Sequence, residues 1–107
     1  MNKDVLDIYE NAISKCPEIE RKGKSVPYTS SNGHMFSFIN KDGDLGIRFS
    51  KERQQEFFNK YNTSYFHSHG AKMNGYIQIT NSMLEDQDLI VELLLESYNY
   101  VNSLKPK

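Results

Sequence analysis

The sequence contains a single cysteine, Cys16, so no disulfide bond can form within the chain. A domain that is stable without disulfides is typical of reducing compartments, and this predicts a cytoplasmic protein. The sequence also lacks apolar runs of the ~20 residues that a membrane-spanning helix needs. Its first segment, MNKDVLDIYENAI, carries charges inside its apolar pattern, unlike a signal peptide. We therefore expect no contact with a membrane.

An excess of charge of one sign is also missing. The 13 basic and 14 acidic side chains give a net charge of −1, so the chain has no general attraction to nucleic acid or membranes. There is no G-x-S-x-G sequence, and the glycines stand singly, outside any phosphate-binding loop. Cys16 lies on the apolar side of a predicted helix, where a cysteine is usually a small core residue. We therefore expect neither an enzyme nor a bound cofactor.

The residues that are present predict one globular domain over residues 1–107. A chain of this length fits a single domain and can bury about two thirds of its unfolded surface. Hydrophobic residues make up 37% of the chain, and seven tyrosines and six phenylalanines supply large side chains for a core.

The spacing of apolar residues predicts three helices and about five strands. A helix over residues 5–16 ends before Pro17, a second follows Ser50, and one long helix begins at Ser82. The predicted strands are residues 25–30, 35–40, 45–49, 64–69 and 75–79. Helices that flank or interrupt an antiparallel sheet predict the α+β class, as a two-layer sandwich.

Asn-Gly and Asp-Gly pairs predict where the strands turn. They stand at residues 32–33, 42–43 and 74–75, so the first three strands form a meander and the last two form a further pair. Alternation along a strand predicts that Phe36 and Phe38 share one face. By the same reasoning, Leu45, Ile47 and Phe49 face the core.

Two histidines form the most suggestive metal-binding pattern. His67 and His69 are two residues apart on a predicted strand, so their side chains would point to one face. Zinc requires three or four ligands, and no other ligand type forms a recognisable spaced pair with them. The alternative is a solvent-facing strand that runs into a turn, and we favour that interpretation.

Basic and polar residues near the first hairpin form the candidate binding set. Arg21, Lys22 and Lys24 stand close together, and Arg48 joins them at that end of the predicted sheet. This group could contact nucleic acid or an acidic protein surface, or it could be a solvated loop. The polar residues Tyr28, Asn32 and His34 surround the first turn and form a candidate recognition surface, although polar residues are also ordinary in turns.

The predicted last helix is acidic. Residues 82–104 contain five acidic and no basic side chains, which could steer a partner without specifying it. Leu89, Val91 and Leu95 lie off its main apolar stripe. They either cover a further part of the core or form a face for self-association.

Two segments of the chain resemble the N-terminal domain of the TfoX family. They are VPYTSSNGHMFSFINKDGDLGIRFSKERQQEFFNKYNTSYF and GYIQITNSMLEDQDLIVELLLESYNYVNSLKPK. The similar features are the M-F-S-F-I strand, the Asp-Gly hairpin into L-G-I-R-F with its following helix, and a last helix ending in S-L-K-P-K. The resemblance extends from about Cys16 to the C-terminus. It implies an α+β sandwich with an antiparallel sheet, similar to the secretion-chaperone-like fold.

The resemblance implies regulation rather than catalysis. Named members of the TfoX family are bacterial regulators of DNA-uptake competence, which act on transcription with a partner regulator and carry a second, helical domain. This chain ends at Lys107, so we expect a stand-alone domain. The family offers no catalytic residues to transfer.

Three hypotheses follow for the function. The first is a non-enzymatic cytoplasmic module that binds another protein, such as a transcription regulator, through the sheet edge or the long last helix. The second is a nucleic-acid-binding accessory protein that uses the basic loop at residues 21–24 with Arg48. The third is a metal-dependent activity at His67 and His69.

Overall fold

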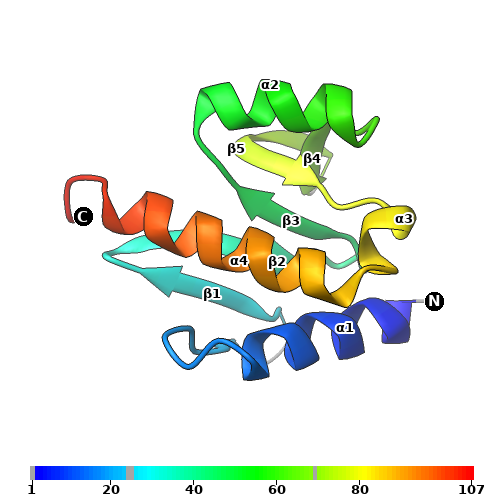
Figure 1. Cartoon of the computed structure of the whole chain (residues 1–107), viewed down its shortest axis with the longest axis horizontal. Helices are drawn as coiled ribbons and strands as arrows, with labels where there is room; N and C mark the ends of the chain where they lie inside the picture. The colour runs from blue at the N-terminus through cyan, green and yellow to red at the C-terminus, as the bar shows by residue number, and fades with distance from the viewer. Residues whose placement is uncertain (1, 24–25, 69) are drawn as a thin grey trace.

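The computed structural model describes residues 2–23, 26–68 and 70–107, except for the side chains of residues 2–4. Its elements confirm the predicted α+β class, with helices near the N-terminus, in the middle and near the C-terminus (Figure 1). In chain order they are α1 (Asn2–Ser14), β1 (Tyr28–Ser31), β2 (His34–Ile39), β3 (Leu45–Arg48), α2 (Lys51–Lys60), β4 (Tyr65–Ser68), β5 (Ala71–Gln78), α3 (Asn81–Leu84) and α4 (Gln87–Asn102).

The strands form one antiparallel five-stranded sheet in the order β1-β2-β3-β5-β4. The meander β1-β2-β3 follows the two predicted hairpin turns, and β5 then pairs with β3 instead of with β1. This confirms the predicted meander plus a further pair of strands. It also places β3 in the middle of the sheet, with β1 and β4 at its edges.

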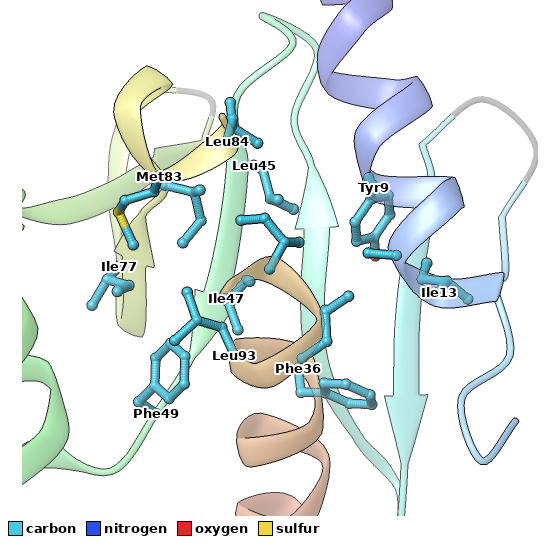
Figure 2. Packing of buried hydrophobic residues seen from close by; sticks show 14 of the residues in the cluster. Tyr9, Ile13, Phe36, Leu45, Ile47, Phe49, Ile77, Met83, Leu84 and Leu93 are labelled. Atoms are coloured by element: carbon cyan, nitrogen blue, oxygen red, sulfur yellow. The ribbon is translucent and has the colours of Figure 1, made fainter. Parts of the chain in front are cut away.

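The helices form a layer on one face of the sheet. Figure 1 shows α4 lying across the strands, with α1 on one side of it and α2 on the other. The main core lies between this layer and the sheet, and Figure 2 shows side chains of α1, α3, α4 and the strands pointing toward one another. Leu45, Ile47 and Phe49 all belong to this core, as their alternation predicted. No helix among the described residues is long and apolar enough to cross a membrane.

A group of buried hydroxyls joins α1 to the sheet inside this core. The phenolic oxygen of Tyr9 lies 2.7 Å from the hydroxyl oxygen of Ser37, which lies 2.5 Å from that of Thr29. All three side chains are fully buried. Each hydroxyl therefore has a partner within the group, as buried polar groups require.

A bulge in β2 changes which face its residues take. Thr29 pairs with Ser37, but the next residue of β1, Ser30, pairs with Met35, so Phe36 is left without a partner of its own. Phe36 lies in the core beneath the helices, whereas Phe38 lies on the opposite face of the sheet. The prediction that Phe36 and Phe38 share a face is wrong, because the extra residue resets the alternation.

The turn between β4 and β5 also differs from the prediction. Ser68 pairs with Ala71, so the chain turns next to Gly70, which has a φ of 77°. The predicted turn pair at residues 74–75 lies inside β5 instead, where Gly75 has a φ of 93°. The glycine therefore marks an irregularity within a strand, which is the other common position for an isolated strand glycine.

The predicted last helix is divided into α3 and α4. Thr80 caps α3 by accepting a hydrogen bond from the backbone of Met83, and Asp86 caps α4 by accepting one from the backbone of Leu89. A carboxylate cap satisfies a helix N-terminus and favours a new start at that point. Ser50 caps α2 in the same way, as predicted.

Candidate functional site

A second cluster of aromatic side chains lies on the face of the sheet opposite to the helices. Phe38, Phe66 and Tyr76 are buried there, and Tyr28, Met35 and Met73 pack against them. Every member of the cluster lies in a strand, and no described helix contributes to it. Among the described residues, this side of the sheet is therefore free of helices, whereas the other side is covered by them.

The buried part of the cluster is built on a glycine of β3. Gly46 pairs with Phe38, and a β-carbon on Gly46 would come within 2.5 Å of the Phe66 ring. The rings of Phe38 and Phe66 meet edge to face, with centroids 5.2 Å apart. Strand β4 curves over this face, since its His67 carbonyl accepts a 2.8 Å hydrogen bond from the amide of Asn40 at the end of β2. Glycine is needed because the phenyl ring occupies the space of a side chain.

Tyr76 connects β5 to β2 across the central strand. Its hydroxyl donates a 2.7 Å hydrogen bond to the backbone carbonyl oxygen of Met35. Burial raises the pKa of Tyr76 to about 12, although the positive charge of Arg48 opposes this shift. The phenol therefore stays protonated at neutral pH and serves as a structural donor.

The accessible part of this face is apolar. Tyr28, Met35 and Met73 are half-buried, and Val26, just before β1, is 42% exposed. Val26 is the one large hydrophobic residue among the described residues that is classed as exposed. We call the surface formed by Val26, Tyr28, Met35 and Met73 the open face.

Basic residues border the open face. Lys22 forms a β-bridge with Tyr28, and Arg48 pairs with Tyr76. Because directly opposed residues of an antiparallel pair share a face, both basic side chains start on the same face as these tyrosines. The ammonium nitrogen of Lys22 donates a 3.0 Å hydrogen bond to the hydroxyl of Ser30. The guanidinium carbon of Arg48 lies 5.8 Å from the centre of the Tyr100 ring of α4, so the charged end of this side chain lies where this side of the sheet meets the helix layer. Three members of the predicted binding set, Lys22, Tyr28 and Arg48, are thus brought to one side of the sheet.

The other predicted binding residues lie elsewhere. Arg21 forms an ion pair with Glu10 of α1, at 3.1 Å between Nε and Oε2. Lys24 lies outside the described residues. Of the two described basic residues in the loop at residues 21–24, Lys22 borders the open face and Arg21 does not.

Asn32 and His34 hold the end of α4. The Asn32 amide donates 2.9 Å hydrogen bonds to the carbonyl oxygens of Val101 and Leu104, and Nε2 of His34 lies 2.9 Å from the carbonyl oxygen of Lys105. Asn32 also has a φ of 57°, which asparagine tolerates better than most residues. In this position both side chains satisfy carbonyl groups at a helix C-terminus, as a cap does.

The predicted metal pair is only partly described. His67 is exposed on β4, and His69 lies outside the described residues. Within residues 2–23, 26–68 and 70–107, no group of three or more His, Cys, Asp or Glu side chains is placed to hold a metal ion. Cys16 is buried in the main core, and burial raises the pKa of its thiol, so this cysteine is a core residue.

Both outer edges of the sheet are partly occupied. On the β1 side, the backbone of Lys22 exchanges hydrogen bonds of 2.8 and 3.0 Å with the backbone of Tyr28. On the β4 side, Asn40 occupies the carbonyl of His67. Both edge strands have only four residues. Short, occupied edges give an added strand little to pair with.

A cavity of about 290 Å³ lies where α1, the β2–β3 turn and the β5–α3 junction meet. Val5, Leu45 and Leu84 contribute apolar walls. Asp44 is the one charged residue among the described residues that line it. This volume is at the lower limit for small-molecule sites, and we assign no chemistry to it.

The apolar residues beside the main stripe of α4 pack on the core. Leu89, Val91 and Leu95 are half-buried against the main cluster. This favours the first of the two roles predicted for them, which is to cover a further part of the core.

Sequence reasoning did not identify the second cluster. Phe66, Tyr76 and Met73 were not among the predicted site residues, and only the glycine inside the L-G-I-R-F strand signalled a close approach at that position.

No family model, curated protein or solved structure matches this chain. The resemblance to the TfoX N-terminal domain, with the fold family and regulatory role that it implies, remains a prediction.

Proposed function

We propose that this chain is a non-enzymatic protein-binding module that uses the open face of its sheet. The observation that carries the proposal is a helix-free face on which apolar side chains remain accessible. Tyr28, Met35 and Met73 are half-buried against the aromatic cluster, and Val26, two residues before Tyr28, is 42% exposed. Methionine and tyrosine are frequent in protein interfaces, because the first adapts its shape and the second offers a large rigid surface.

The rigid support under this surface favours binding. Phe38 and Phe66 are 7% and 0% exposed, and Tyr76 is fixed by its hydrogen bond to Met35. The accessible side chains therefore stand on a packed base that does not need to be ordered when a partner binds. A preorganised surface loses less entropy on association.

The sequence suggested two other binding surfaces, the sheet edge and the long last helix, and both are less suited to binding a partner. The edges of the sheet are short and partly occupied, and the apolar residues beside the stripe of α4 are packed against the core. The open face differs from them in adjoining Val26, the one large hydrophobic residue classed as exposed among the described residues. A regulatory partner, such as a transcription regulator, fits the role that the TfoX resemblance implies.

The test is an affinity capture from lysate of the source cells with three forms of the tagged protein. They are the wild type, the double variant Val26→Asp/Met73→Asp, and the control Gln55→Asp/Asn59→Asp, which adds the same charge to exposed positions of α2. We expect a stoichiometric protein that the wild type and the control capture and that the open-face variant does not. The capture is repeated with nuclease.

The outcomes discriminate between the hypotheses. A protein captured equally by all three forms would place the binding surface elsewhere and overturn the proposal. Capture that disappears with nuclease would favour the nucleic-acid hypothesis. Circular dichroism and urea denaturation of each variant establish that the folded state is retained.

A further inference from the structure

The charges of the sheet and of helix α4 differ in sign. The five described strands contain no Asp or Glu, and their Lys and Arg residues are Arg48 and Lys72. Helix α4 contains Asp88, Glu92 and Glu96 and no Lys or Arg. The chain as a whole is nearly neutral, so this separation is a property of the fold and not of the composition.

The basic groups that border the open face have no acidic partner within the described residues. The ion pairs there join Arg21 to Glu10 and Arg53 to Glu56 and Glu96. Lys22 contacts a neutral hydroxyl, and Arg48 faces the Tyr100 ring of α4. Neither charge is therefore paired with a carboxylate in the part of the chain that the structure describes.

We infer, on the basis of the proposed function, that the partner presents an acidic segment with apolar anchors. Its apolar side chains would pack on Val26, Met35 and Met73, and its carboxylates would pair with Lys22 and Arg48. Lys22 borders β1 at one edge of the apolar surface, whereas Arg48 ends β3, which lies between the strands that carry Met35 and Met73. Complementary charge around an apolar centre sets the orientation and rate of binding.

The acidic charge of α4 adds direction to this recognition. An acidic segment is repelled by α4 and attracted by the opposite side of the sheet. The separation of charge therefore disfavours binding on the covered face, which is how like charges exclude a wrong arrangement.

A single-stranded nucleic acid fits this surface less well. Bases bind by stacking on accessible rings, whereas the rings of Phe38, Phe66 and Tyr76 are 7%, 0% and 6% exposed. Only Tyr28 offers a partly accessible ring in the cluster. Adaptable methionine side chains favour contacts with apolar side chains instead.

The experiment selects short random peptides, displayed on phage, against three immobilised proteins. These are the wild type, the charge-reversed variant Lys22→Glu/Arg48→Glu, and the control Lys51→Glu/Lys60→Glu. The control has the same change in net charge, at exposed positions of α2 in the helix layer. We expect the wild type and the control to select peptides rich in Asp and Glu beside Leu, Ile and Phe. We expect the charge-reversed variant to select Lys and Arg.

A synthetic peptide of the selected consensus is then measured by fluorescence anisotropy. Reversing both charges is expected to weaken its binding roughly 10-fold, and binding to the wild type should weaken with added salt. In NMR spectra, the peptide should shift the amide signals of Tyr28, Met35 and Met73 and leave those of α4 unchanged.

The inference would be overturned if the wild type selected neutral or basic peptides or no peptide at all. It would also be overturned if the charge-reversed variant selected the same acidic peptides as the wild type. Oligothymidylate that bound more tightly than the peptide and shifted the same amide signals would favour nucleic acid instead. Neutral peptides that bind the wild type but not Val26→Asp/Met73→Asp would remove the acidic partner and leave the protein-binding function standing.

Discussion

The ring of Phe66 lies over the α-carbon of Gly46 so closely that a β-carbon there would come within 2.5 Å of it. The contact joins an edge strand to the central strand across the open face. Gly46 lies in the sheet without a positive φ, so its identity is set by this ring and not by the backbone.

Gly46→Ala should therefore destabilise the protein by on the order of 1–3 kcal/mol, because the ring must move from a well-packed position. Urea denaturation measures this difference. In a double-mutant cycle, Phe66→Leu should reduce the cost of Gly46→Ala, since a smaller side chain leaves room for the methyl group. Strictly additive effects of the two substitutions would show that the ring is not the obstacle.

The free energy of unfolding should fall at alkaline pH. Burial raises the pKa of both Tyr9 and Tyr76 from 10.0 to about 12, so the folded protein holds these protons more tightly than the unfolded chain. The stabilisation is complete below pH 10 and is lost as the pH rises toward 12. Each tyrosine contributes a slope of up to about 1.4 kcal/mol per pH unit.

Denaturation curves across this range, with ultraviolet absorbance of the phenolate, measure both effects. Tyr9→Phe and Tyr76→Phe should each remove part of the slope. At neutral pH, Tyr76→Phe should also cost about 1 kcal/mol, because the carbonyl of Met35 loses its donor. A slope that survives in the double variant would have to come from other groups.

The side-chain amide of Asn32 should be essential for holding the end of α4. Asn32→Asp replaces its donor with a carboxylate that faces the carbonyl oxygens of Val101 and Leu104, and we expect a loss of roughly 1–3 kcal/mol. Asn32→Gly keeps the left-handed backbone and removes only the hydrogen bonds, so its cost should be smaller. Hydrogen exchange should accelerate at the Lys107 amide, which donates to the Asn32 carbonyl. Wild-type stability in Asn32→Asp would refute this role.

The ion pair between α2 and α4 should contribute modestly. Arg53 donates to both carboxylate oxygens of Glu96, at 2.7 and 3.0 Å, and its guanidinium carbon lies 4.4 Å from the centre of the Phe57 ring. Arg53→Lys keeps the charge but loses the paired geometry. Since the Arg53 side chain is 43% exposed, we expect a cost below about 1 kcal/mol that shrinks with added salt. A salt-independent loss would indicate that packing on Phe57 dominates.

The parts of the fold that local rules determine were predictable from the sequence. Leu45, Ile47 and Phe49 alternate without interruption, and Ser50 is a strong helix cap, so both predictions are confirmed. The face of Phe36 was not predictable, because a bulge depends on pairing with a distant strand. From the sequence alone, Asp86 could lie inside one long helix or cap a second helix. In the structure its carboxylate accepts a hydrogen bond from the backbone of Leu89, so Asp86 is a cap.

The candidate site was predictable only in part. Lys22, Tyr28 and Arg48 were each in the predicted set, and the structure brings them to one side of the sheet. Asn32 and His34 were in the same set because polar residues that form a turn and polar residues that bind a partner give the same sequence pattern. Their actual partners, the carbonyls at the end of α4, are far along the chain, and no local pattern reveals such contacts.

The packing of α1 against α4 also determines when the fold can be completed during synthesis. At ~5–20 residues per second, ribosomes need several seconds to make the chain between these two helices. During that time Tyr9 and Ile13, which are buried in the finished protein, have no α4 to cover them. The nascent chain therefore exposes these apolar side chains until α4 has been made and can pack on them.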